Sequence, residues 1–148
     1  MVDAKSRTVQ RPGQVKEITS LTNPVIKSLK GLALKKNRDA DGLFLAEGLK
    51  HAMDALDQGW QMTALIYAKS MSGHELASAT AARARASGAD ILEVSEKVLS
   101  SITKRDNPQM VISVLRQNWA DATALLKQQH HADDTLVVLD RVRDPGNL

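Results

Sequence analysis

The 148-residue chain contains no cysteine. It can therefore form no disulfide, no thiolate metal site and no cysteine nucleophile, and this composition fits a reducing compartment. Aromatic residues are also scarce, at 3% of the chain. Proteins that bind single-stranded nucleic acid by stacking need exposed aromatic side chains, so the sequence argues against that mode and favours backbone and shape contacts with any nucleic acid.

Long apolar runs and glycine-rich phosphate loops are missing as well. No run approaches the roughly 20 apolar residues that cross a bilayer, and residues 1–10 lack the apolar stretch of a secretory signal. We therefore expect a cytoplasmic protein with no membrane partner. The sequence has neither GxxxxGK(S/T) nor GxGxxG. His130 and His131 are adjacent and point in different directions, so we predict no metal site.

Charge is distributed unevenly along the chain. The net charge is +3, but residues 1–50 contain ten Lys/Arg and five Asp/Glu, whereas the other 98 residues contain ten and twelve. A basic N-terminal third on a near-neutral body indicates a polyanionic partner contacted from that end. The alternative is an ordinary lysine-rich helix whose charges only face solvent.

The stretch NPVIKSLKGLALKKNR, residues 23–38, has the pattern of an amphipathic helix. Asn23 is a good N-cap and Pro24 suits the first helical position. The helical period places Val25, Ile26, Leu29, Leu32 and Ala33 on one face, and Lys27, Lys30, Lys35 and Arg38 on the other. Lys36 lies near the apolar stripe and would have to extend along it. These five basic residues are the candidate contacts to a polyanion.

After residue 42 the pattern alternates between strands and helices. The sequence predicts strands at 43–48, 62–68, 90–95, 109–117 and 135–140, and helices at 49–60, 74–88, 96–103 and 119–131. This alternation predicts an α/β fold, a layered and mostly parallel sheet with flanking helices. Residues 1–17 are polar and aperiodic and are expected to be a flexible arm. A domain is expected over 18–116, a linker over 117–134 and the start of a second domain over 135–148.

Two further motifs carry candidate chemistry. Glu47 and Gly48 join a predicted strand to a helix, where the carboxylate is expected to cap the helix or to pair with Lys36 or Arg38. It could also hold a basic group ready for phosphate. The chain ends with LVVLDRVRDPGNL, a strand that leads into a turn. Asn147 would be a natural N-cap for a following helix, although the turn composition alone is common.

Taken together and in order, NPVIKSLKGLALKKNR, FLAEGLKHAMDAL, NPQMVISV and LVVLDRVRDPGNL resemble the SpoU (TrmH-like) branch of the SPOUT RNA methyltransferases, over residues 18–148. The resemblance implies an RNA substrate-binding domain similar to a ribosomal RNA-binding protein, followed by a knotted catalytic domain. It also implies S-adenosylmethionine-dependent 2′-O-methylation of ribose in structured rRNA or tRNA by a homodimer. Asn147 matches the catalytic asparagine of the first motif. Met110 stands where the family usually has glycine.

In this family the motif around Asn147 continues into an arginine-bearing helix and two further motifs that form the cofactor pocket, whereas this sequence stops at Leu148. We therefore expect the substrate-binding domain followed by the first strand of a truncated SPOUT domain. The 148 residues are then the RNA-recognition part of a methyltransferase, with no cofactor site and no activity of their own. The alternative is a stand-alone, non-catalytic RNA-binding module.

Overall fold

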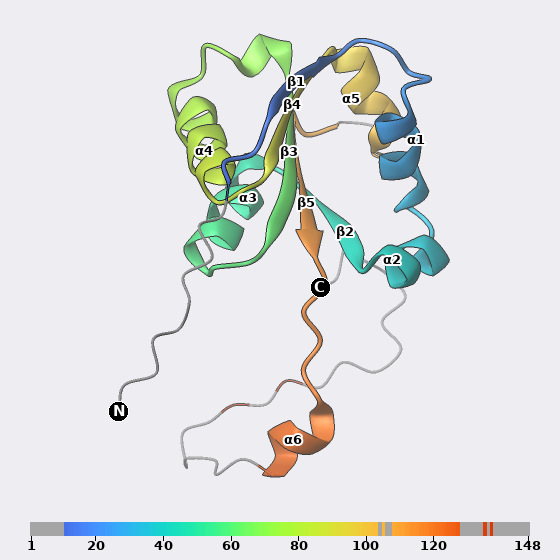
Figure 1. Ribbon diagram of the computed structural model, residues 1–148, viewed down its shortest axis with the longest axis vertical. Coiled ribbons are helices and arrows are strands. Elements are labelled where there is room, and N and C mark those ends of the chain that lie inside the picture. Colours follow the sequence, from blue (N-terminus) through green and yellow to red (C-terminus); the bar gives the residue numbers. More distant parts are fainter. Residues whose placement is uncertain (1–10, 104, 106–107, 128–134, 136, 138–148) are drawn as a thin grey trace. The chain divides into compact units, whose positions relative to one another are not determined.

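The computed structural model describes residues 11–103, 105, 108–127, 135 and 137. A five-stranded sheet has helices on both faces (Figure 1). The strands are β1 (Val15–Ile18), β2 (Leu43–Glu47), β3 (Met62–Ala68), β4 (Asp90–Val94) and β5 (Val111–Arg116). The α-helices are α1 (Pro24–Gly31), α2 (Lys35–Asp41), α3 (Leu49–Asp57), α4 (Glu75–Ala86), α5 (Glu96–Ile102) and α6 (Ala122–Lys127), and η1 (Lys69–Met71) is a 3-10 turn.

The sheet has the strand order β1-β4-β3-β5-β2. β4 pairs in parallel with both β1 and β3, whereas β5 is antiparallel to both β3 and β2. Four of the five strands consequently run in one direction, which confirms the predicted α/β fold with a mostly parallel sheet. The reversed direction of β5 was not predicted, because hydrophobic periodicity carries no information about strand direction.

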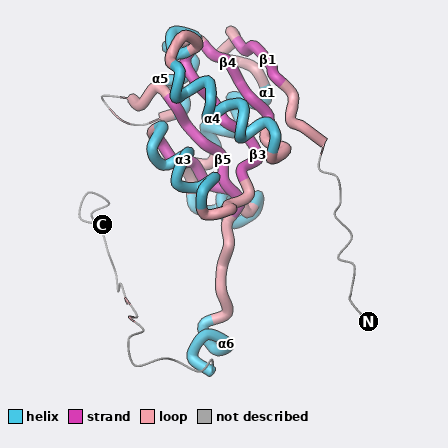
Figure 2. The backbone as a smooth tube through the Cα atoms, turned by 90° about the vertical axis from the view of Figure 1, so that its left-hand side faces the viewer, coloured by secondary structure: helices cyan, strands magenta, loops and turns pink. Residues whose placement is uncertain are grey.

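The core lies on both faces of the sheet. One cluster packs α1 and α5 against it and includes Ile26, Leu99 and Ile112. The other cluster packs the alanine-rich α4 and α3 against the opposite face and includes Ala84, and Figure 2 shows these two helices lying across that face. β5 contributes alternate side chains to the two clusters, so Val111 through Leu115 are all buried.

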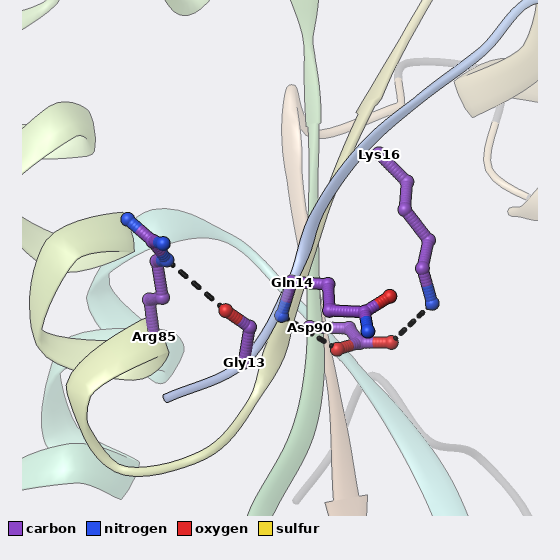
Figure 3. A network of polar contacts seen from close by, with 5 residues as sticks. All are labelled: Gly13, Gln14, Lys16, Arg85 and Asp90. Atoms are coloured by element: carbon purple, nitrogen blue, oxygen red, sulfur yellow. Dashed lines mark hydrogen bonds and ion pairs between the residues drawn. The ribbon is translucent and has the colours of Figure 1, made fainter. Parts of the chain in front are cut away.

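Part of the segment that was expected to be a flexible arm is an edge strand. Val15–Ile18 forms β1, in parallel register with Ile91–Val94. Side chains hold this strand in place in addition to the backbone hydrogen bonds of the sheet (Figure 3). The Arg85 Nε donates to the Gly13 carbonyl at 3.0 Å, and the Lys16 ammonium lies 2.7 Å from the Asp90 carboxylate. The sequence missed this strand because three of its four side chains are exposed and polarity masks its alternation.

Asp90 joins β1 to β4 through both carboxylate oxygens. One oxygen accepts from the Lys16 ammonium and the other accepts from the Gln14 backbone N–H at 2.9 Å. The Lys16 hydrogen bond, followed by the backbone hydrogen bond, lowers the pKa of Asp90 below its ordinary value. Because the folded-state pKa is depressed, this contact stabilises the fold above the unfolded pKa and is lost as the pH falls through the folded pKa.

Asn118 and the residues after it form a second unit, separate from the one that ends at Gln117. In this unit α6 begins after Asp121, whose carboxylate accepts from the Thr123 backbone N–H at 2.9 Å. The predicted strand 135–140, apart from residues 135 and 137, lies outside the described residues, as do His130, His131 and Asn147. None of the helices in the described ranges has the length and apolar character of a membrane span.

Replacing Gly13 with alanine should destabilise the fold. A Cβ at this position would lie 1.8 Å from the backbone carbonyl oxygen of Ala89, which cannot move without shifting β4. We expect Gly13→Ala to lower the free energy of unfolding by about 1–3 kcal/mol, as overpacked sites do, in urea denaturation. Gly73→Ala is the matched control, since a Cβ there meets no atom within 4 Å; equal stability of the two variants would contradict the close approach.

Candidate nucleic-acid interface

The basic stretch at residues 23–38 folds as two helices, not as the single helix that its periodicity predicts. Asn23 caps α1 as expected, because its side-chain oxygen accepts from the Val25 backbone N–H at 2.9 Å. α1 ends at Gly31, and Leu34 then takes an extended conformation before α2 begins. The predicted apolar face is buried only in part: Ile26, Leu29 and Leu32 are buried, whereas Val25 is 42% exposed.

Side chains of α2 close the end of α1. The Arg38 Nη1 donates to the carbonyl oxygens of Leu32 and Ala33, both at 3.0 Å, and the Asn37 side-chain amide donates to the Gly31 carbonyl at 2.8 Å. The last carbonyls of a helix have no partner within it, so these bonds replace the intrahelical ones. Arg38 was predicted to face a polyanion together with the lysines, but it is half-buried and holds the turn between the two helices.

The four lysines of α1 and α2 differ in whether their ammonium groups are free to bind a polyanion. The Lys35 ammonium pairs with the Asp39 carboxylate one helical turn later, with 79% and 50% of the two side chains exposed. A surface pair of this kind is worth little energy. Among the described residues, the ammonium groups of Lys27, Lys30 and Lys36 form no hydrogen bond or ion pair with a side chain. Lys36 is exposed on α2, so the expectation that it extends along the apolar stripe is wrong.

The two helical layers of the domain carry different charge. α1 and α2 together hold five cationic and two acidic side chains, a net of +3. On the other face of the sheet, α3 and α4 hold three cationic and three acidic side chains, a net of zero. Two cations of that layer are paired with carboxylates, in the Lys50–Asp54 and Arg83–Asp57 bridges. The positive potential of the domain is therefore concentrated on the α1–α2 side.

Glu47 ends β2 beside this basic layer. Its Oε1 accepts from the Thr103 hydroxyl at 2.7 Å, and its Oε2 lies 3.6 Å from the Arg105 Nε. The expected pairing with Lys36 or Arg38 is wrong, and α3 has no side-chain cap at its N-terminus. The sequence could not reveal the Thr103 partner, which is 56 residues away. Oε2 is buried and makes no hydrogen bond, a state that costs about 1–3 kcal/mol for a polar group.

Gly48 fits the expected turn from β2 into α3. Its φ of 114° lies in the region that side chains other than glycine disfavour. Its backbone N–H donates to the Val111 carbonyl at 2.8 Å, which fixes the turn against the start of β5. Gly48 therefore sets the backbone that presents Glu47.

A pocket of about 350 Å³ opens where the α1–α2 turn, β2 and the end of α5 meet. Leu32, Leu45 and Ile102 supply apolar walls, and Arg38, Glu47 and Thr103 supply polar groups. The described residues contain no cluster of His, Cys, Asp and Glu side chains that could hold a metal ion. The site therefore combines a basic helical surface with a pocket that has both donors and acceptors, an arrangement suited to binding an anionic polymer rather than to nucleophilic chemistry.

The α/β sheet with a basic helical surface has the features of a nucleic-acid-binding domain, and comparison with known proteins identifies its family. Residues 23–113 match the model of the MRM3-like substrate binding domain. The chain belongs to this family, and the predicted resemblance to the SpoU methyltransferases is confirmed. A comparison with curated proteins gives no match.

Solved structures show the same relationship. The crystal structure of an rRNA methyltransferase from Sinorhizobium meliloti is 48% identical over 73% of this chain and 39% of its own, with a TM-score of 0.66. An RNA 2′-O ribose methyltransferase is 30% identical over 89% of this chain and 48% of its own, with a TM-score of 0.68. The SpoU methyltransferase AviRb from Streptomyces viridochromogenes, 18% identical over 68% of this chain and 38% of its own, shares the fold at a TM-score of 0.60. The chain thus spans less than half the length of each of these relatives.

Substitution of Arg38 should weaken the fold more than substitution of a neighbouring lysine. Arg38→Ala removes two charge-assisted hydrogen bonds to helix-end carbonyls, so we expect a loss of about 1.5–3 kcal/mol in the free energy of unfolding. Lys36→Ala on the same helix should change it by about 0.5 kcal/mol or less. Urea unfolding monitored by circular dichroism measures both; equal losses would show that Arg38 does not hold the turn.

Proposed function

We propose that this chain is the RNA-recognition part of an S-adenosylmethionine-dependent RNA 2′-O-ribose methyltransferase. The observation that carries the proposal is the group of three lysines, Lys27, Lys30 and Lys36, that have no acidic partner among the described residues and lie on the helices of a substrate-binding domain. Ammonium groups in this state are free to replace the counterions of phosphates. The structured RNA they bind would be rRNA or tRNA, and Lys35 and Arg38 would add to the positive field.

The whole enzyme is proposed from what its relatives are. The S. meliloti relative is an rRNA methyltransferase with an AdoMet-bound structure, and a second relative is an RNA 2′-O ribose methyltransferase. From the SpoU resemblance and the composition, we further propose that the whole protein acts in the cytoplasm as a homodimer. S-adenosylmethionine supplies the methyl group when it is bound. The pocket beside β2 is lined by residues of the unit that ends at Gln117, and we do not assign it to this cofactor.

In this proposal the domain contributes positioning and not chemistry. The lysines bind the RNA backbone electrostatically, which fixes the register of the RNA and brings one ribose to the catalytic domain. Asn147, which matches the catalytic asparagine of the family, would act in that second domain. It lies outside the described residues, so its role is proposed on the sequence motif alone.

Neutralising the three lysines should weaken RNA binding and its dependence on salt. If Lys27, Lys30 and Lys36 each contact one phosphate, the variant Lys27→Gln/Lys30→Gln/Lys36→Gln should reduce the slope of log K against log salt by about 2 to 3. Filter binding of total rRNA over a range of salt concentrations measures this slope.

The control for this experiment changes the net charge by the same amount on the opposite helical layer. Ala79→Glu/Ala82→Glu/Ala86→Glu alters three exposed positions of α4. We expect this variant to retain the slope of the parent chain, with a small overall loss of affinity from the added negative charge. If both triple variants lose the same slope, net charge alone explains binding and the α1–α2 surface is not the interface.

The 148 residues by themselves should not bind the methyl donor. We expect isothermal titration calorimetry with S-adenosylmethionine to give no stoichiometric binding, and methyl transfer to rRNA to be undetectable. RNA retention by the same preparation is the control for correct folding. A one-to-one binding isotherm would contradict the assignment of this chain to recognition alone.

A further inference from the structure

The pocket beside β2 has the dimensions of a small-molecule site. Its volume of about 350 Å³ lies within the range of roughly 300–1,000 Å³ that is typical of such sites. The apolar walls come from Leu32, Leu45 and Ile102, and the polar groups from Arg38, Glu47 and Thr103. The occupant should therefore have apolar faces and a polar edge, as a planar heteroaromatic ring does.

Glu47 offers this pocket unused acceptor capacity. Thr103 donates to one carboxylate oxygen, while the other is buried without a hydrogen bond. Among the described residues, the cation within 4 Å of this carboxylate is the Arg105 guanidinium, whose Nε at 3.6 Å is too distant for a hydrogen bond. With 63% of its side chain exposed, Arg105 is able to move away at little cost and to leave the carboxylate to another donor.

Arg38 offers the complementary donors. Both hydrogen bonds that it makes to the α1–α2 turn start from Nη1. A guanidinium group has five N–H donors, so Nε and Nη2 together keep three that have no partner among the described residues. The pocket thus has a donor group and an acceptor group on its lining at once.

We propose that this pocket binds an unpaired guanine base of the RNA. Guanine carries two adjacent N–H donors, at N1 and N2, which suit the Glu47 carboxylate, and two acceptors, O6 and N7, which suit an arginine. None of the other three bases has two adjacent donors. The aliphatic walls cover the ring, and Arg105 leaves Glu47 as the base enters. Recognition of splayed-out bases through their edges is the usual route to sequence-specific RNA binding.

The proposal rests on the proposed RNA-recognition function and adds base selection to it. Arg38 of the pocket lies on α2, the helix that also holds Lys36, and Leu32 of the pocket directly follows α1, the helix that holds Lys27 and Lys30. The phosphate contacts and the base pocket therefore belong to one surface. Phosphate contacts would set affinity, and the pocket would select one nucleotide.

The test measures the affinity of the 148-residue chain for five labelled RNA pentanucleotides by fluorescence anisotropy at low salt. The probes are UUGUU, UUAUU, UUCUU, UUUUU and UUIUU, where I is inosine. We expect UUGUU to bind about tenfold more tightly than the A, C and U probes, because a bidentate contact discriminates by this order. Inosine lacks the N2 amino group and should fall between.

Glu47→Gln should abolish this preference, because the amide replaces an acceptor with a donor while the side chain keeps its shape. Glu93→Gln is the matched control: Glu93 is also half-buried in the sheet, on β4, where it accepts from the Tyr67 hydroxyl, and its substitution should leave the preference intact. Ala33→Met, which fills the pocket and leaves its polar side chains unsubstituted, should also remove the preference and gives an independent result if Glu47→Gln unfolds.

Two results would overturn the inference: equal binding of all five probes, or a guanine preference that survives both Glu47→Gln and Ala33→Met. If the probes bind equally and the triple lysine variant still loses its salt slope, the base pocket is wrong and the RNA-recognition function stands. If neither rRNA nor any probe is retained by the parent chain, both are wrong.

Discussion

Two hydrogen bonds from one guanidinium group organise the functional side of this domain. The Arg38 Nη1 binds the carbonyl oxygens of Leu32 and Ala33, and this contact lets a continuous basic stretch fold as two helices that meet at a turn. The break keeps the apolar residues of α1 on the core, leaves Lys36 exposed on α2 and creates the wall of the pocket next to β2.

The sequence predicted the features that depend on local rules. The run Met62–Ala68 is a strand with the predicted bounds, and Asn23 caps the helix that it precedes. It did not predict features that depend on distant partners. The helical period continues through Leu32 and Ala33, so periodicity does not reveal the break before α2, which the Asn37 and Arg38 side chains stabilise. The direction of β5 and the Thr103 partner of Glu47 depend likewise on how the sheet assembles.

The family resemblance identified the class of molecule, whereas the structure separated the roles of residues that the sequence had grouped. Five basic side chains formed one candidate set, yet Arg38 supports the turn, Lys35 pairs with Asp39, and three lysines have no partner among the described residues. A charge pattern records how many cations a segment holds. Only their surroundings decide which of them bind a partner and which hold the protein together.

The pairing of β1 with β4 has a consequence for how the protein is made. Lys16 on β1 precedes its partner Asp90 on β4 by 74 residues, so it leaves the ribosome well before that partner. A parallel pairing that spans so much chain closes late, because the loop entropy must be overcome before any contact compensates for it. We therefore expect β1 to pair after β3 and β4 have formed and to complete the sheet at its edge.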